Sequence, residues 1–382
     1  MRTIDCDRAG RARRGLAPRA AALHDAPMEN APLKFLERLI DTPSPSGFEA
    51  GAQRVWAEYV KPHCDEFRSD AYGNCFARLG NPDKKPHIVL AGHIDELGFM
   101  VSHINDDGFL FVQGIGGTDP GLFRGQRVRV HGKKGSIPGV TGSLAIHLQA
   151  PDDRKKVPEM HEMYIDIGAG SKAEAEKHVR VGDAITYADG FDLLENHRAA
   201  ARGCDNRIGV WSAAEALRQL SAKPPAVCVT AVSTIQEENG LYGATMAAYA
   251  LQPDVALVVD VTHGTDIPNC SKPKHGDVRL GKGPVISHGS SNHPVVVERL
   301  VAVAQKEKIP VQFEANPRRT GTDADAFFLQ RGGCPTVSIG LPNRYMHSPV
   351  EVIDLRDLEA LARLLAAFCR SVKPGESFHV KV

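Results

Sequence analysis

Residues 86–101, PHIVLAGHIDELGFMV, contain the stretch that decides the fold. HIVLAG, residues 87–92, is a short apolar run that stops at a glycine. Such a run is typical of a strand buried on both faces of a sheet. It leads directly into His93, Asp95 and Glu96. Because ligands of open α/β sheets bind beyond the carboxyl ends of the strands, this segment predicts a buried parallel strand that ends at a functional edge.

Three apolar runs in the second half of the chain repeat this pattern, and helical stretches separate them. The runs are AVCVTAVSTI (226–235), DVALVVDV (254–261) and TVSIGL (336–341). Stretches with helical spacing of apolar residues lie near residues 33–40, 50–60, 208–220, 294–307 and 355–372. Buried strands that alternate with helices favour an α/β fold with a mostly parallel sheet sandwiched by helices.

Residues 101–198 have a different character. Short alternating runs, FLFVQ (109–113), RVRVHG (127–132) and AITYA (184–188), lie between glycine-rich turns, which predicts a small β-rich domain. The simplest organisation is one α/β domain, residues 28–100 and 199–382, interrupted by this insertion. Residues 1–27 contain six arginines against three aspartates and show no periodic apolar pattern, so we expect a disordered leader there.

Composition and charge exclude several classes of protein. The 382 residues include 46 Lys plus Arg and 46 Asp plus Glu, so the net charge is +0. A neutral chain has no overall electrostatic reason to bind nucleic acid or an anionic membrane, and no apolar run approaches the roughly 20 residues that span a bilayer. The eight cysteines stand singly, without a CxxC pair. This usage argues against a zinc ribbon and favours a reducing, cytoplasmic environment.

Acidic residues and histidines follow the four predicted strands and precede one helix. They are His93, Glu237, Glu238, Asp260, His347 and Asp205. Since the carboxyl ends of parallel strands lie at the same edge of a sheet, we expect these side chains to converge. Two histidines and three carboxylates, without a cysteine, suit two divalent ions such as Zn, Co or Mn. A bridging carboxylate would hold such a pair about 3.5–4 Å apart.

The adjacent acids Glu237 and Glu238 need separate roles. Neighbouring residues on an extended segment point to opposite sides, so one can bind metal while the other faces a water molecule as general base. The same geometry argues against a glycosidase, in which two carboxylates must flank one bond from different directions.

Six motifs, taken together and in order, resemble those of the M42 metallo-aminopeptidases, a group that includes tetrahedral and glutamyl aminopeptidases. The motifs are AGHIDELGFMV (91–101), CDNRIG (204–209), EENGLYGA (237–244), VVDVT (258–262), TGTDADAF (320–327) and NRYMHSPVE (343–351). The resemblance extends from about Leu33 to the helix near residue 372. Tyr242 departs from the pattern, because a basic residue is often expected there, and this leaves the side-chain specificity open.

The resemblance implies a role for each site residue. The first ion would be held by His93, Asp205 and Asp260, and the second by Asp205, Glu238 and His347. Asp205 would thus bridge both ions. Glu237 would be the general base, and Asp95 would orient the imidazole of His93. The family also implies that the β-rich insertion dimerises, and that dimers often build a dodecamer.

The expected activity is that of a dinuclear metal-dependent aminopeptidase. It would remove the N-terminal residue of short peptides through a metal-bound hydroxide, with Glu237 as general base. Expected partners are peptides with a free N-terminus and further copies of the chain, without nucleic acid or membrane. Two alternatives remain at this point: a related amidohydrolase of carboxypeptidase or deacylase type, and a catalytically silent peptide-binding scaffold.

Four nearby features have competing interpretations. GIGG (114–117) is expected to be a turn, because it lacks the strand and helix that flank a phosphate-binding loop. Asp323 and Asp325 are either acids at a helix start or part of the active-site edge. His263 is a rival metal ligand. Asp205–Asn206 is expected to be an ordinary trans peptide.

Overall fold

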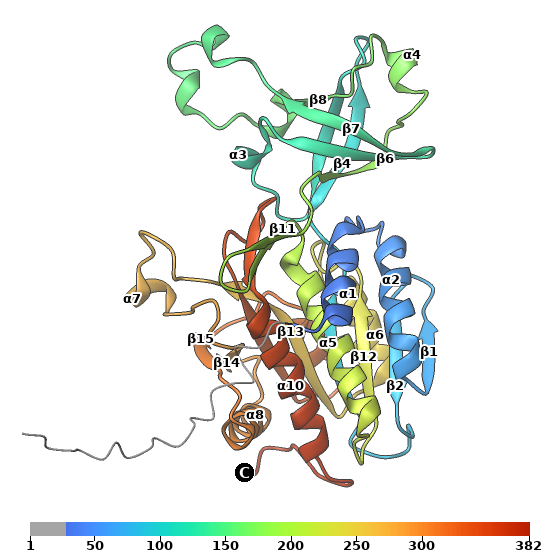
Figure 1. Cartoon of the computed structure of the whole chain (residues 1–382), viewed down its shortest axis with the longest axis vertical. Coiled ribbons are helices and arrows are strands. Elements are labelled where there is room, and N and C mark those ends of the chain that lie inside the picture. Colours follow the sequence, from blue (N-terminus) through green and yellow to red (C-terminus); the bar gives the residue numbers. More distant parts are fainter. Residues whose placement is uncertain (1–27) are drawn as a thin grey trace, which may run out of the picture.

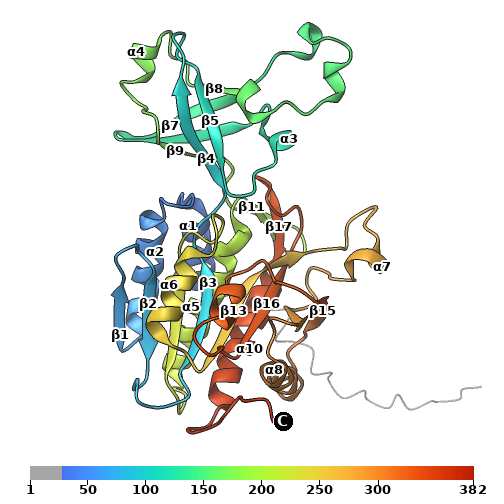
Figure 2. The same cartoon turned by 180° about the vertical axis from the view of Figure 1, so that it is seen from behind.

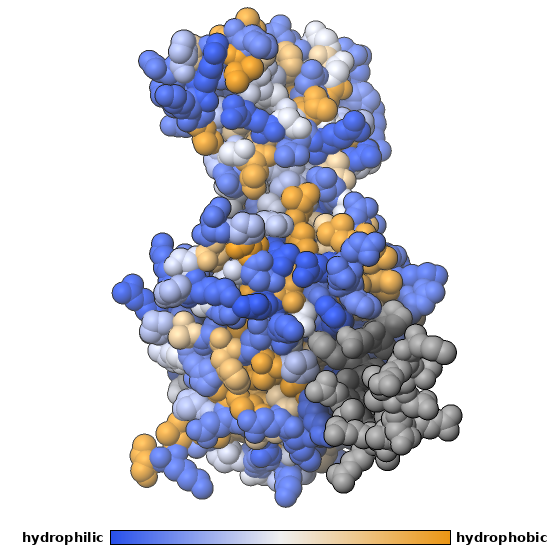
Figure 3. All heavy atoms as spheres, turned by 60° about the vertical axis from the view of Figure 1, so that its left-hand side comes forward, coloured by the Kyte–Doolittle hydropathy of each residue, from blue (hydrophilic) through white to orange (hydrophobic). Residues whose placement is uncertain are grey.

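The structure, a computed structural model, describes residues 28–382. The predicted leader, residues 1–27, lies outside the described residues. A large α/β body carries a smaller β-barrel at one end (Figures 1 and 2). The barrel joins the body through a narrower neck (Figure 3).

The body is built around an eight-stranded sheet, and most of its central strands run parallel. The strand order is β1-β2-β12-β3-β13-β16-β14-β15. Parallel pairing joins β12 to β3, β3 to β13, β13 to β16, and β14 to β15. The strands are β1 (Glu66–Ser69), β2 (Cys75–Leu79), β3 (Ile88–His93), β12 (Val229–Thr234), β13 (Val255–His263), β14 (Val285–Gly289), β15 (Gln312–Asn316) and β16 (Thr336–Asn343).

Helices cover both faces of this sheet, as expected for a sheet with parallel central strands. One face carries α1 (Asn30–Asp41), α2 (Ala50–Val60), α5 (Cys204–Ala222), α8 (Pro294–Glu307) and α10 (Leu355–Ser371). The other face carries α6 (Tyr242–Leu251) and α9 (Ala324–Phe328). Side chains of one strand alternate between these two cores: Ile88 and Leu90 pack on the first, Val89 and Ala91 on the second. The predicted helix-covered α/β sheet is confirmed.

The barrel is closed, with strand order β4-β5-β8-β7-β6-β9. Its strands are β4 (Gly98–Ile104), β5 (Leu110–Ile115), β6 (Arg127–Gly132), β7 (Gly135–Gly142), β8 (Tyr164–Asp166) and β9 (Ala184–Tyr187). Phe99, Val101, Val128, Ile165 and Ile185 are among the residues of a core separate from that of the body. Because β4 begins soon after β3 ends, the barrel lies over the carboxyl-end edge of the sheet (Figure 1).

The remaining elements are short. A three-stranded sheet near the neck has the order β10 (Asp192–Leu194), β11 (Arg198–Ala201) and β17 (Glu351–Asp354). Short helices are α3 (Pro120–Phe123), α4 (Lys172–Ala175), α7 (Lys272–His275), η1 (Lys61–His63), η2 (Ile146–Leu148), η3 (Asp153–Lys155) and η4 (Met160–Glu162). Among the described residues, none of the helices combines the length and apolar character that crossing a bilayer requires.

Candidate metal centre

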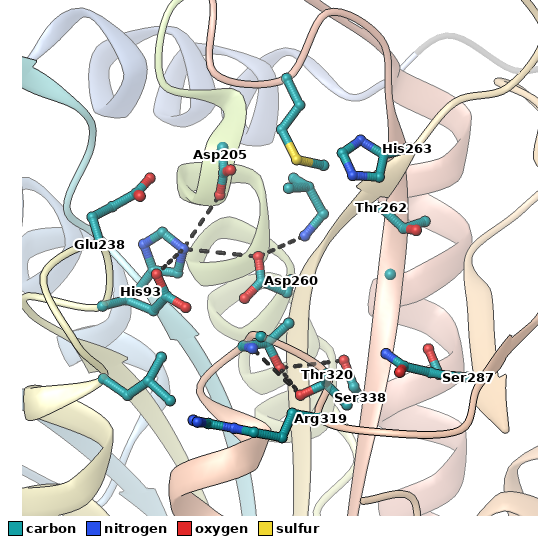
Figure 4. A pocket seen from close by; sticks show the side chains of 18 of the residues that line it. His93, Asp205, Glu238, Asp260, Thr262, His263, Ser287, Arg319, Thr320 and Ser338 are labelled. Carbon is teal, nitrogen blue, oxygen red and sulfur yellow. Dashed lines mark hydrogen bonds and ion pairs between the residues drawn. The ribbon is translucent and has the colours of Figure 1, made fainter. Parts of the chain in front are cut away.

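The six predicted ligand and base residues meet at the carboxyl edge of the sheet. His93 is the last residue of β3, Glu237 and Glu238 follow β12, and Asp260 lies within β13. Asp205 stands at the start of α5, and His347 follows β16. Figure 4 shows His93, Asp205 and Asp260 turned toward one another, with Glu238 nearby.

His93 is the centre of the first group of side chains. Its Nε2 lies 3.3 Å from Asp205 Oδ1, 3.8 Å from Glu237 Oε2 and 3.8 Å from Asp260 Oδ1. His93, Asp205 and Asp260 are buried. Ligand atoms of His93, Glu237 and Asp260 all lie within 4.8 Å of one another, close enough to surround one cation.

His347 is the centre of the second group. Its Nε2 lies 3.4 Å from Asp205 Oδ2 and 4.0 Å from Glu238 Oε2. Asp205 therefore turns one oxygen toward His93 and the other toward His347. The Asp205–Asn206 peptide bond is cis, so the expectation of a trans bond is wrong.

The donor set fits two divalent cations. Four carboxylates and two imidazoles converge, with no cysteine among them, as hard or borderline ions such as Zn or Mn require. Glu238 Oε1 is buried and has no hydrogen-bond partner among the described residues. Burying a carboxylate oxygen without a partner destabilises the folded protein. A bound cation would provide the missing partner, so the position of this oxygen suits a metal ligand.

The crowding of acids perturbs their pKa values. Burial raises the pKa of Glu237 to about 9, and the charges of Asp260 and Asp323 add to the increase. Burial, together with the charge of Asp205, raises the pKa of Glu238 well above its usual range. Burial also acts to raise the pKa of Asp205, but hydrogen bonds to His347 and His93 hold it low. Neighbouring cations would favour the charged form of each carboxylate.

Asp95 links His93 to both glutamates. Its Oδ1 lies 3.4 Å from His93 Nδ1. The same carboxylate accepts hydrogen bonds from the backbone N–H of Glu237 and of Glu238, each at 3.1 Å, and from the hydroxyl of Ser46. Asp95 therefore contacts the imidazole and holds the backbone of the turn that presents both glutamates, a position that suits the predicted role of orienting His93.

Glu96 does not join this site, although it stands next to Asp95 in the sequence. It is buried and accepts hydrogen bonds from Arg202 Nη1 and Arg207 Nη2, each at 2.5 Å. His263, the rival ligand, lines the same cavity but belongs to neither group. The pattern of polar residues after buried strands therefore predicted the edge of the sheet where the site lies. It did not distinguish Glu96 from the neighbouring site residues His93 and Asp95.

Glu351 is a functional candidate that the sequence pattern did not predict. It is buried, and its Oε2 accepts a hydrogen bond from Asp205 N at 3.0 Å, while its Oε1 accepts one from His347 N at 2.9 Å. Burial and the charge of Asp205 raise its pKa to about 8. One carboxylate therefore fixes the backbones of two predicted ligands that are far apart in sequence.

Glu351→Gln is expected to weaken metal binding about 10- to 100-fold, because an amide has one acceptor oxygen for two backbone donors. Calorimetric titration of the metal-free protein with Zn or Co measures the affinity. Thermal unfolding of the metal-free variant reports on folding alone, and Glu307→Gln, on the exposed end of α8, is the matched control. Unchanged affinity would show that Glu351 does not position the ligands.

The barrel contributes backbone to the site. The carbonyl of Gly117, in the predicted GIGG turn, lies 3.1 Å from His347 Nδ1. A Cβ at Gly117 would lie 3.2 Å from the same ring, and a Cβ at Gly116 would lie 3.1 Å from Glu238 Cβ. Glycine at both positions therefore allows the turn to approach the ligands closely.

The TGTDADAF loop also reaches the active-site edge. Asp323 is fully buried, its Oδ2 accepts a hydrogen bond from Thr234 Oγ1 at 2.5 Å, and its Oδ1 has no partner among the described residues. Burial raises the pKa of Asp323 to about 7. Asp325, in the first turn of α9, accepts hydrogen bonds from the backbone N–H groups of Thr320 and Gly321 and so fixes the loop that precedes this helix.

A cavity of about 800 Å³ opens beside these residues. Its walls include both predicted metal groups, together with Thr262, Ser287 and Glu314. Figure 4 shows Thr262 and Ser287 on the side of the cavity away from Glu238. The cavity is large enough for a side chain and the adjoining peptide backbone.

Comparisons with known proteins give the same assignment. The profile of the M42 glutamyl aminopeptidase family matches residues 73–364. The lysyl aminopeptidase of Pyrococcus furiosus is 36% identical over 89% of this chain and 97% of its own length.

Two solved structures share the whole fold. The TET aminopeptidase of a marine sediment archaeon of the Thaumarchaeota has a TM-score of 0.86, with 34% identity over 90% of this chain and 97% of its own. The TET1 peptidase of Pyrococcus horikoshii has a TM-score of 0.80, with 32% identity over 89% of this chain and 100% of its own. The resemblance carried by the six motifs is confirmed, and the chain belongs to the M42 glutamyl aminopeptidase family.

Proposed function

We propose that the protein is a dinuclear metal-dependent aminopeptidase that releases the N-terminal residue of short peptides. The observation that supports this most strongly is the position of Asp205, whose two carboxylate oxygens face His93 and His347 from a single side chain. A carboxylate in that position suits a bridge between two ions. Family membership supports the same reaction class.

In this proposal His93, Asp205 and Asp260 hold the first ion, and Asp205, Glu238 and His347 hold the second. Zn, Co and Mn all suit these ligands. When bound, two such ions would polarise the scissile carbonyl and lower the pKa of a water molecule.

Glu237 is the proposed general base. The residue lines the cavity, its Oε2 lies 3.8 Å from His93 Nε2, and Asp95 accepts a hydrogen bond from its backbone N–H. Oε2 would take a proton from the attacking water and return it to the leaving amine. Glu238, the next residue, faces His347, so the two acids serve different neighbours.

The free α-amine of the substrate would be held at the same edge. The carboxylates there favour a cationic ammonium group, and an N-acylated peptide lacks that charge. Assay of aminoacyl chromogenic substrates beside their N-acetylated forms tests this point. Hydrolysis confined to the free amines is expected, whereas preferential hydrolysis of the acetylated forms would favour a deacylase instead.

We further propose that the barrel joins copies of the chain as a dimer within a larger assembly. The related TET1 peptidase of Pyrococcus horikoshii can assemble into a tetrahedron or a large octahedral shell. In this chain the long β7–β8 connection exposes a group of large apolar side chains: Leu144, Ile146, Leu148 and Val157. Exposed apolar groups of this kind mark interaction surfaces.

The double variant Ile146→Asp and Leu148→Asp is expected to dissociate the assembly, because a buried interface tolerates two added carboxylates poorly. Sedimentation velocity measures the mass. Leu329→Asp, an equally exposed apolar position on the body, is the control. An unchanged mass in the double variant would place the interface elsewhere.

A cytoplasmic location is also proposed. The seven cysteines among residues 28–382 are all free thiols, and five of them are buried. Reduced, buried thiols are typical of reducing compartments.

A further inference from the structure

We infer that Glu314 makes this enzyme select peptides whose N-terminal residue is lysine or arginine. The inference rests on the proposed aminopeptidase function and adds the class of side chain that the enzyme accepts. Glu314 lies on β15 and lines the cavity that contains His93, Asp260 and His347. It belongs to neither group of predicted metal ligands.

The sheet forms a floor that leads from the metal centre to Glu314. Asp260 and Thr262 are two residues apart on β13, so both side chains lie on the same face of the sheet. On the neighbouring strand β16, Gly340 pairs with Asp260. A Cβ at Gly340 would lie 2.7 Å from Thr262 Cγ2. The absence of a side chain there keeps the floor open between the metal centre and the far wall.

Two hydroxyl groups fix the carboxylate of Glu314 at that wall. Thr262 Oγ1 donates a hydrogen bond to Oε2 at 2.7 Å, and Ser287 Oγ donates one to Oε1. A carboxylate has about four lone-pair sites, so further donors can still bind it. Among residues 28–382 no lysine, arginine or histidine forms an ion pair with Glu314. Its negative charge is therefore held in place and has no partner cation in the described part of the chain.

The position of this charge matches a long cationic side chain. Thr262 lies about 6.6 Å along β13 from Asp260, at 3.3 Å per residue. A substrate residue whose backbone is held beside Asp260 would therefore direct its side chain toward the Glu314 carboxylate. The four-carbon stem of lysine spans such a distance, and its ammonium group brings three donors. An acidic side chain would meet a like charge there.

The cavity also contains one residue, Arg319, that could favour substrates with an acidic N-terminal residue. Arg319 Nε, however, lies 3.4 Å from Asp325 Oδ2, and the side chain is 79% exposed. Figure 4 shows Arg319 along a different side of the cavity from Thr262 and Ser287. An arginine that is paired with a buried carboxylate and open to solvent attracts an acidic substrate weakly.

The test compares lysyl, norleucyl and glutamyl chromogenic substrates with the metal-loaded enzyme. Norleucine has the same stem as lysine without the ammonium group. We expect kcat/KM for the lysyl substrate to exceed that for the norleucyl substrate about 10- to 100-fold, the range for a hydrogen bond to a charged group. The glutamyl substrate should be the slowest. Glu314→Gln should remove most of the lysyl advantage and leave norleucyl hydrolysis within about threefold.

Calorimetric binding of the free amino acids tests the same preference independently of the reaction rate. Calorimetry with free lysine and free norleucine, both reaction products, should show the same preference in the wild type and its loss in Glu314→Gln. Glu298→Gln, an exposed glutamate on α8, is the matched control. The wild-type comparison stands even where the variant folds poorly, which its thermal unfolding would reveal.

The possible failures are distinguishable. Absence of hydrolysis for all three substrates would overturn the aminopeptidase proposal, and this inference with it. Hydrolysis with no preference for lysine would overturn the role of Glu314 alone. A preference for glutamyl substrates that Arg319→Gln removes would assign the charge selection to Arg319 instead.

Discussion

Dialysis of the protein against a strong chelator is expected to reduce peptidase activity to background, and addition of Zn, Co or Mn is expected to restore it. The physical reason is the concentration of charge around Asp205. Without cations, four acidic side chains share one partly buried edge, and burial raises the pKa of three of them, Glu237, Glu238 and Asp260. The site in that state lacks the positive charge that a developing oxyanion requires.

Metal analysis gives this experiment a readout besides activity. We expect two ions per chain in the loaded wild type, and fewer than two in Asp205→Ala, because that variant removes the proposed bridge. Rescue by each metal in turn identifies which ions support catalysis. Full activity of a protein shown to be free of metal would refute the proposed mechanism.

Glu237→Gln is expected to lower kcat by about 10²- to 10⁴-fold, the contribution typical of a general base. The amide keeps the size of the side chain and cannot accept the proton of the attacking water. Both ions should remain bound, and substrate affinity should change little. Steady-state kinetics and metal analysis of the same preparation measure the two effects separately.

Glu238→Gln is the matched comparison, because it makes the same change one residue away. It should lose metal, since Glu238 contributes one of the oxygens near His347. The reverse pattern, with metal lost from Glu237→Gln alone, would exchange the two roles. That outcome has a structural basis, because the Glu237 carboxylate also lies within reach of a cation held by His93 and Asp260.

The sequence predicted the central strands and the edge residues because both depend on local chemistry. A strand buried on two faces must be apolar along its length, so HIVLAG and DVALVVDV are recognisable without tertiary information. Polar residues at the carboxyl end of such a run lie where α/β sheets bind their ligands. This position identified His93 and Asp260 as candidate site residues. Their convergence followed from parallel pairing, which brings β3 and β13 side by side.

Other parts of the fold and site depend on contacts that leave little local signal. Strands β14 and β15 have five residues each, and no residue of β15 is buried, so neither strand carries the apolar run by which the other strands were predicted. Glu351 acts through two backbone N–H groups, 146 and four residues away in sequence. Gly117 acts through a carbonyl oxygen, which every residue possesses. Only the folded arrangement distinguishes these groups from their neighbours.

The Gly117 contact has a consequence for the proposed assembly. A carbonyl from the barrel steadies the imidazole of His347, so the orientation of that ring depends on how the barrel sits over the sheet. In the proposed assembly, a change in the position of the barrel would therefore also change the position of a predicted metal ligand. A separated protomer would then differ from an assembled one in chemistry as well as in mass.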